Sequence, residues 1–204
     1  MSAPPRIVVF DIGNVLVRWD MRFLFEKVIT DRGELDRFLT EVCTLSWHGA
    51  LDAGATYKDA TAELTARFPE YTDIIALYDP RWQETIYGPI NGSVVILETL
   101  RAAGVRTFAI TNFPAEKFDE TCAHYPFLAG FEGVIVSGRE RIVKPSSAIF
   151  RLFLDRFGLK ASDCVFIDDN TANVAAARDV GMTALCFETP DKLARDLREL
   201  GLPA

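Results

Sequence analysis

Polar residues suited to metal and phosphate chemistry stand at or near the ends of short apolar runs in this sequence. They are Asp11, Thr111, Asn112, Lys144, Asp168 and Asp169. Three carboxylates with one lysine would repel one another, and a hard divalent cation such as Mg²⁺ resolves this because it prefers oxygen ligands. A metal flanked by lysine, threonine and asparagine donors also suits a phosphate dianion. The residue types therefore indicate metal-assisted phosphoryl chemistry, provided that the fold brings them together.

The elements that must position these residues are apolar runs rich in β-branched side chains. Such runs are typical of strands buried on both faces of a parallel sheet. We expect strands at residues 7–10, 105–110, 133–136, 164–167 and 183–187. Helical patterns alternate with them at residues 92–103, 114–125, 146–158, 172–180 and 190–200. The alternation predicts an α/β fold with a doubly wound parallel sheet.

Three of the polar groups directly follow an expected strand. Asp11, Thr111 and Asp168 stand at strand ends, and Lys144 lies in the loop after another strand. Because the carboxyl ends of parallel strands share one edge of the sheet, these groups can converge there. A carboxylate that touches both a metal and phosphorus can attack in line and form an aspartyl-phosphate. Capping of the following turn is the alternative role for Asp11.

A long stretch between the first two expected strands is the candidate for a separate domain. Residues 18–88 show helical patterns and no expected strand; these include 57–68 and 72–88, the second interrupted or begun near Pro80. The stretch is too long for an ordinary connection. We expect an inserted α-helical cap at 18–88, with residues 1–17 and 89–204 forming the core domain. Its tryptophans, Trp47 and Trp82, are expected in the cap core, and Arg81 in a surface ion pair.

The composition is that of an ordinary globular protein, with 49% hydrophobic and 25% charged residues. Lysine and arginine number 22 against 29 acidic residues, a net charge of −7 without any basic block. We therefore expect neither a nucleic-acid partner nor a membrane partner. No run approaches membrane-spanning length and the first residues lack a signal-peptide core, so a cytoplasmic location is expected. The pattern carries no prediction of the oligomeric state.

Four short motifs occur in order along the chain: Phe10–Leu16, Ala109–Asn112, Lys144–Pro145 and Phe166–Asn173. Together they resemble the motifs of the haloacid dehalogenase-like hydrolase superfamily, and the resemblance covers nearly the whole chain. The first motif is similar to that of bacterial sugar-phosphate phosphatases. The fourth is similar to that of the phosphatase domain of soluble epoxide hydrolase. The resemblance implies a Rossmann-like core with a small helical cap.

The same resemblance implies a Mg²⁺-dependent phosphatase that acts on a small phosphorylated metabolite, such as a sugar phosphate. Asp11 would be the nucleophile, and Thr111 and Lys144 would complete the catalytic set. The residues implied at the phosphate are Thr111 and Lys144; Asn112 is a further candidate there from its side-chain donor, with a role in the turn as the alternative. The residues implied at the metal are Asp11, the carbonyl group of Gly13, Asp169, and Asp168 through the metal's water shell.

One position departs from the family pattern. Most phosphatases of the family carry a second aspartate two residues after the nucleophile, as general acid and then base, and here that residue is Gly13. A missing general acid can cost roughly 10²–10⁴ in rate. Either the leaving group needs little protonation, as in an anomeric sugar phosphate, or His48 or Asp20 substitutes. A third reading is a weakly active regulator that binds metal and phosphate.

A 2-haloacid dehalogenase is the competing enzyme class. It would also use an aspartate nucleophile, and it too lacks the second aspartate. However, it needs no metal, and its fourth motif carries serines where Asp168 and Asp169 stand here. Two adjacent carboxylates would repel its carboxylate substrate unless a cation intervened. The sequence therefore favours a phosphatase over a dehalogenase.

Overall fold

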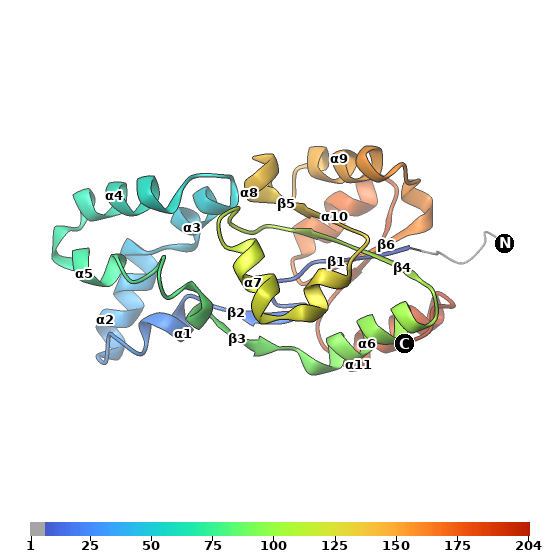
Figure 1. The fold of residues 1–204 in the computed structure, drawn as a ribbon, viewed down its shortest axis with the longest axis horizontal. Helices are drawn as coiled ribbons and strands as arrows, with labels where there is room; N and C mark the ends of the chain where they lie inside the picture. The colour runs from blue at the N-terminus through green and yellow to red at the C-terminus, as the bar shows by residue number, and fades with distance from the viewer. Residues whose placement is uncertain (1–6) are drawn as a thin grey trace.

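A five-stranded parallel sheet forms the centre of the computed structural model, which describes residues 7–204 (Figure 1). Its strand order is β5–β4–β1–β6–β7. The strands are β1 (Ile7–Phe10), β4 (Arg106–Thr111), β5 (Gly133–Val136), β6 (Cys164–Asp168) and β7 (Thr183–Cys186). Every expected strand is present, with ends within one residue of the prediction. The predicted α/β fold with a doubly wound parallel sheet is confirmed.

The central strand β1 contributes to two separate hydrophobic cores. Val8 and Phe10 pack into one core, and Ile7 and Val9 into the other. Successive side chains of a strand point to opposite faces of the sheet. A strand that is covered on both faces must therefore be apolar throughout, which explains the uninterrupted apolar run in the sequence.

Helices cover both faces of this sheet (Figure 1). Those on the face of Val8 and Phe10 are α6 (Asn91–Ala102) and α11 (Pro190–Glu199). Those on the opposite face are α9 (Ser147–Phe157) and α10 (Thr171–Asp179). The helix expected from residue 114 begins later, as α7 (Phe118–His124), because residues 114–117 form a turn. None of the helices within residues 7–204 has the length and apolarity needed to cross a membrane.

The remaining short helices of the core are α8 (Ser137–Glu140), η4 (Pro126–Gly130) and η5 (Ala161–Asp163). Residues 20–85, between β2 (Val17–Trp19) and β3 (Ile86–Pro89), form a helical body at one end of the molecule, coloured blue to green in Figure 1, and are called the cap below. Its elements are α1 (Arg22–Phe25), α2 (Arg32–Arg37), the π-helical turn η1 (Phe38–Val42), α3 (Leu45–Asp52), α4 (Tyr57–Arg67), η2 (Pro69–Tyr71), α5 (Thr72–Ile75) and η3 (Trp82–Thr85). As expected, Trp82 is buried, and Arg81 pairs with Glu84 at 2.6 Å.

The prediction that residues 18–88 contain no strand is wrong. Strands β2 (Val17–Trp19) and β3 (Ile86–Pro89) pair as an antiparallel ribbon where the chain enters and leaves the cap. Both are too short to show a strand period. The second also contains Gly88 and Pro89, residue types that are depleted in strands. The helical pattern over residues 72–88 is interrupted around Pro80, as expected, into α5 and η3, but it ends in the strand β3.

Helix α8 approaches the loop after β4 so closely that residue 138 has room only for glycine. A Cβ atom there would lie 2.6 Å from the Ala115 nitrogen and 2.8 Å from the Phe113 oxygen. We expect Gly138→Ala to lower the free energy of unfolding by about 1–3 kcal/mol, measured by urea denaturation. In the control Gly49→Ala, within α3, the new Cβ meets nothing within 4 Å, and stability should rise by about 0.5–1 kcal/mol. Equal effects of the two substitutions would contradict this account.

Candidate active site

The sheet changes its winding direction at β1. The chain runs from β1 to β4 and β5 on one side, and returns to β6 and β7 on the other. Open α/β sheets bind ligands beyond the carboxyl ends of their strands at such a switch point. The register pairs Phe10 with Ile167, and the Asp11 amide donates to the Ile167 oxygen at 2.8 Å. Asp11 and Asp168, which follow these two residues, are therefore neighbours at that edge.

Lys144 joins the two neighbouring aspartates. Its Nζ atom lies 2.8 Å from Asp11 Oδ1 and 2.7 Å from Asp168 Oδ2, and its side chain is almost wholly buried. Burial disfavours the charged ammonium group, but the two carboxylates outweigh that effect and raise the pKa of Lys144. The lysine is therefore held in its charged form between the ends of β1 and β6.

Two asparagines hold this arrangement in place. The Asn112 side chain accepts a hydrogen bond from the Lys144 amide at 2.8 Å and donates one to the Lys144 oxygen at 3.1 Å. The Nδ2 atom of Asn173 donates to both oxygens of Asp168, at 3.0 and 3.1 Å. Because the Asn112 amide group is engaged with the main chain of Lys144, this geometry favours a positioning role for Asn112 over the expected phosphate contact.

Thr111, at the end of β4, carries a hydroxyl group that the fold does not use. The residue is completely buried, and its Oγ1 atom has no hydrogen-bond partner in the described chain. A buried polar group without a partner costs about 1–3 kcal/mol, so its presence calls for an explanation. A ligand bound at this edge of the sheet would supply the missing hydrogen bond, in keeping with the expected phosphate role of Thr111.

The carboxylates of Asp11, Asp168 and Asp169 are close enough to share one cation. One oxygen from each lies within 4.8 Å of the other two. Burial raises the pKa of Asp11 to about 7, against the opposing charge of Lys144. Burial and the neighbouring Asp168 also raise the pKa of Asp169. Three carboxyl groups thus face one lysine, and burial opposes the charged form of two of them. A divalent cation would favour their charged form, and an all-oxygen donor set of this kind fits Mg²⁺.

The three aspartates differ in how free their oxygens are. Both carboxylate oxygens of Asp168 already accept hydrogen bonds, from Lys144, Asn173 and the Asn170 amide. Within residues 7–204, no other residue donates a hydrogen bond to the carboxylate of Asp169. Direct coordination of a metal by Asp168 would compete with its bond to Lys144. Asp169 and Asp11 are thus the better-placed ligands, and Asp168 is better placed to hold the lysine.

The turn after β1 leaves the carbonyl group of Gly13 available to a metal. The Asn14 amide donates to the Val17 oxygen at 2.7 Å, and the Val17 amide donates to the Ile12 oxygen at 3.1 Å. None of the hydrogen bonds of this turn ends on the Gly13 oxygen. A Cβ atom on residue 13 would meet nothing within 4 Å, so the missing second aspartate is not explained by lack of space.

The structure does not place His48 or Asp20 as a substitute acid. His48 is buried, with Nδ1 2.8 Å from the Tyr78 hydroxyl, and burial lowers its pKa to about 3. Its imidazole is therefore neutral near pH 7. Asp20 is exposed and accepts a hydrogen bond from the Arg22 amide at 2.8 Å. In the described chain, no hydrogen bond or ion pair joins Asp20 to the carboxylates at the sheet edge.

A cap residue that the sequence did not single out lies close to this site. Asp52, the last residue of α3, has a side chain that is 14% exposed, and its Oδ1 atom has no hydrogen-bond partner among residues 7–204. Burial raises the pKa of Asp52 to about 7, with a further increase from the charge of Asp11 and a decrease from Lys144. No motif or periodicity marks a single carboxylate in an irregular stretch, and only its proximity in sequence to His48 could have pointed to it.

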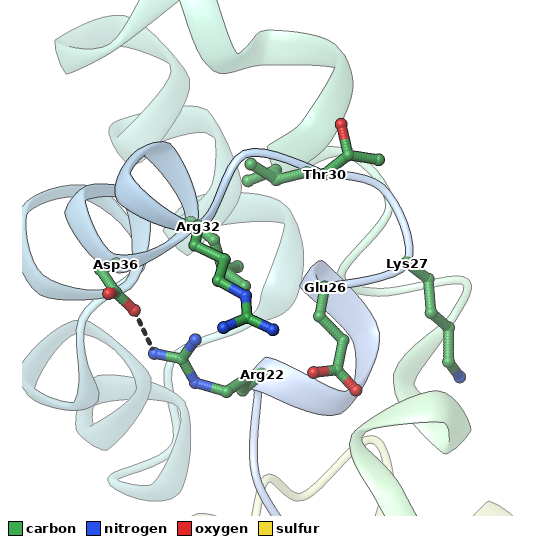
Figure 2. A pocket seen from close by; sticks show the side chains of 8 residues that line it. Arg22, Glu26, Lys27, Thr30, Arg32 and Asp36 are labelled. Atoms are coloured by element: carbon green, nitrogen blue, oxygen red, sulfur yellow. Dashed lines mark hydrogen bonds and ion pairs between the residues drawn. The ribbon is translucent and has the colours of Figure 1, made fainter.

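A separate polar cavity lies on the cap (Figure 2), and its lining includes none of the clustered carboxylates. It has a volume of about 630 Å³, and its lining residues include Arg22, Glu26, Lys27, Arg32 and Asp36. Arg22 pairs with Asp36 at 2.6 Å, and Lys27 pairs with Glu84 at 3.0 Å. Its lining mixes positive and negative side chains and, among the residues that the structure describes, contains no group of carboxylates that could share a cation, whereas the sheet edge gathers three carboxylates. We therefore place the candidate active site at the sheet edge.

One sequence relative is named a hydrolase of flavin mononucleotide, and another is named a phosphatase. Flavin mononucleotide hydrolase 1 of Arabidopsis thaliana is 31% identical over 118 residues, which are 57% of this chain and 47% of that protein. A sesquiterpene phosphatase of Aspergillus oryzae is 24% identical over 207 residues, which are 96% of each protein. The chain therefore spans about half the length of the first relative and nearly all of the second.

Solved structures share the fold at low sequence identity. A HAD family enzyme from Bacteroides thetaiotaomicron, in complex with magnesium and inorganic phosphate, has a TM-score of 0.69 at 17% identity, covering 91% of this chain and 95% of that one. An L-2-haloacid dehalogenase from Xanthobacter autotrophicus has a TM-score of 0.64 at 18% identity, covering 98% and 85%. A family model described as haloacid dehalogenase-like hydrolase matches residues 5–181. The chain thus belongs to the haloacid dehalogenase-like hydrolase family.

Proposed function

We propose that this hydrolase is a Mg²⁺-dependent phosphatase that acts on a small phosphorylated metabolite through an aspartyl-phosphate on Asp11. The observation that carries the proposal is the meeting of three carboxylates around Lys144, beside the unpaired hydroxyl of Thr111. The carboxylates suit a cation, whereas the ammonium and hydroxyl groups suit phosphate oxygens. This combination of donors and acceptors is what phosphoryl transfer requires.

The relatives support the same class of reaction. One is named for the hydrolysis of flavin mononucleotide, and another is named a phosphatase of sesquiterpenes. The Bacteroides structure of the same fold holds magnesium together with inorganic phosphate. The two named substrates are chemically different, so they support a phosphatase without choosing its substrate. A sugar phosphate remains a candidate from the first motif.

The Asp11 carboxylate is oriented for attack. Its Oδ1 atom accepts a hydrogen bond from the Ile12 amide at 2.7 Å. The same atom forms an ion pair with Lys144 Nζ at 2.8 Å. These contacts fix the carboxylate and leave Oδ2 for phosphorus. When the Asp11–phosphorus bond forms and the ester bond breaks, Lys144 and Thr111 donate to the phosphate oxygens. Water then cleaves the acyl phosphate and frees Asp11, and a bound cation would neutralise charge between carboxylate and phosphate.

The direct test of this function is phosphate release with and without metal. We expect the purified protein to hydrolyse p-nitrophenyl phosphate when Mg²⁺ is present, to stop after EDTA, and to recover when Mg²⁺ is added back. Absorbance of p-nitrophenolate measures the rate. A panel of phosphorylated metabolites assayed in the same way would identify the substrate. Turnover that is indifferent to EDTA would contradict the proposal.

A 2-haloacid dehalogenase is the second candidate, because the fold is shared with a dehalogenase and the nucleophile would be the same aspartate. Its carboxylate substrate would have to approach the adjacent carboxylates of Asp168 and Asp169, of which only Asp168 is paired with Lys144. Chloride release from 2-chloropropionate without metal would favour this candidate. A regulator with little turnover is supported only by Gly13, and the same phosphate assay separates it from an enzyme.

A further inference from the structure

The cap is tied to the core beside the phosphate-binding edge. The Ser137 hydroxyl donates to the main-chain oxygen of Asp52 at 2.7 Å and accepts a hydrogen bond from the Phe113 amide at 2.9 Å. Phe113 lies in the loop that begins after Thr111, at the end of β4. One hydroxyl group therefore links the last residue of α3 to the loop next to the unpaired threonine.

The Asp52 carboxyl group is held in this interface without a partner. Its Oδ1 atom has no hydrogen bond, and the His48 Nε2 atom lies 3.4 Å away without making one. The other nitrogen of that imidazole is already engaged with Tyr78 at 2.8 Å. A largely buried carboxyl oxygen is costly to leave unpaired, and none of the described residues relieves the cost. The described residues therefore leave hydrogen-bonding capacity of this carboxyl group unused.

The charged groups of the proposed reaction centre also act on this carboxyl group, which the Ser137 contacts hold next to the loop after Thr111. The charges of Asp11 and Lys144 both act on Asp52, one raising and one lowering its pKa. Burial is the largest effect, and the resulting pKa is about 7. A group with this pKa exchanges protons readily at neutral pH, as general acid–base catalysis requires.

We propose that Asp52 is the general acid and base of this enzyme, supplying from the cap the carboxyl group that Gly13 lacks. This rests on the proposed phosphatase function. In the first step the Asp11–phosphorus bond forms, the ester bond breaks, and Asp52 gives its proton to the leaving oxygen. In the second step water attacks phosphorus, its proton passes to Asp52, and the Asp11–phosphorus bond breaks. Each cycle consumes one water molecule and restores both aspartates.

The test compares two aryl esters that differ in the basicity of the leaving group. The p-nitrophenolate ion leaves without a proton, whereas the more basic phenolate needs one. We expect Asp52→Asn to lower kcat/KM for phenyl phosphate by about 10²-fold or more, with a much smaller change for p-nitrophenyl phosphate. That constant covers only the steps up to departure of the leaving group. The control Asp73→Asn, an exposed cap carboxylate, should leave both values unchanged.

Two further variants separate proton transfer from folding. Ser137→Ala keeps the Asp52 carboxyl group but removes the hydroxyl that positions it, so the phenyl phosphate rate should fall more than the p-nitrophenyl phosphate rate. Gly13→Asp has open space for its side chain and, added to Asp52→Asn, should restore hydrolysis of phenyl phosphate. Thermal unfolding of each variant checks that the fold is intact.

The outcomes distinguish this proposal from the function on which it rests. Equal losses for both esters in a folded Asp52→Asn protein, or no loss for either, would overturn the role of Asp52 and leave the phosphatase in place. The same holds if Gly13→Asp leaves the ratio of the two rates unchanged. A wild-type protein that hydrolyses neither ester with Mg²⁺ would overturn the phosphatase and the role of Asp52 together.

Discussion

Asp11→Asn should abolish hydrolysis of p-nitrophenyl phosphate, with a loss of about 10⁴-fold or more in kcat. An amide group cannot form the acyl phosphate, so the first covalent step has no nucleophile. The Asn side chain retains an oxygen in the place that accepts hydrogen bonds from Ile12 and Lys144. The variant should therefore remain folded, and the loss of kcat should come from the missing nucleophile. Steady-state rates with Mg²⁺ measure it.

The matched control for this substitution is Asp73→Asn, which removes the same charge from an exposed carboxylate of the cap. Its rate should equal that of the wild-type protein. Circular dichroism and thermal unfolding of Asp11→Asn show whether the protein is folded when it is assayed. A folded variant that keeps a tenth of the wild-type rate would place the nucleophile elsewhere and remove the basis of the proposed mechanism.

The core and its carboxylates were accessible from the sequence because simple rules govern them. Strand β1 is buried on both faces, and this requires an apolar run that the sequence shows plainly. Parallel strands end at a common edge, so Asp11 and Asp168 had to meet if both strands were real. Asp11 and Asp168 are neighbours because the register pairs Phe10 with Ile167. Gly13 lies in the short turn that directly follows β1.

The strands of the cap's connection to the core and the positions of the cap side chains could not be predicted from the sequence. The ribbon of β2 and β3 joins residues that are about 70 positions apart, and each strand is too short to show a period. Asp52 is an equally clear case, because its position depends on Ser137, which is 85 residues away in sequence. Helical spacing gives the face of a helix but not the partner that docks on it. His48 was the more reactive residue type, yet the surrounding aromatic side chains bury it as a neutral imidazole.

Side-chain roles at the sheet edge also needed the structure. Asn112 has the donor group expected at a phosphate, but its amide is used to hold the main chain of Lys144. Asp168 has the carboxylate expected at a metal, but both of its oxygens accept hydrogen bonds. Residue type indicates which chemistry is possible, whereas the hydrogen-bond partners decide which of the similar groups are free to perform it.

Lys144→Met should cause a large loss of stability as well as of activity. Lys144 is the buried cation between Asp11 and Asp168, whose side chains are 11% and 0% exposed. Removing one member of a buried charge cluster leaves the others unpaired, which costs about 3–5 kcal/mol. We expect the free energy of unfolding, measured by urea denaturation without metal, to fall by this amount. Added Mg²⁺ should recover part of it, because a bound cation also separates the carboxylates.

The pH dependence of this loss follows from the sign of the shift at Asp11. Its pKa in the folded protein, about 7, lies above its ordinary value of 3.8, so the folded state loses stability as pH rises between these values. Lys144 is the charge that opposes this rise in the pKa of Asp11. The loss of unfolding free energy caused by Lys144→Met should therefore be larger at pH 8 than at pH 5. The control Lys192→Met removes a partly exposed lysine that pairs with Asp196 at 2.8 Å, and should cost less than about 1 kcal/mol. If both substitutions cost the same, Lys144 is not the cation that holds the site together.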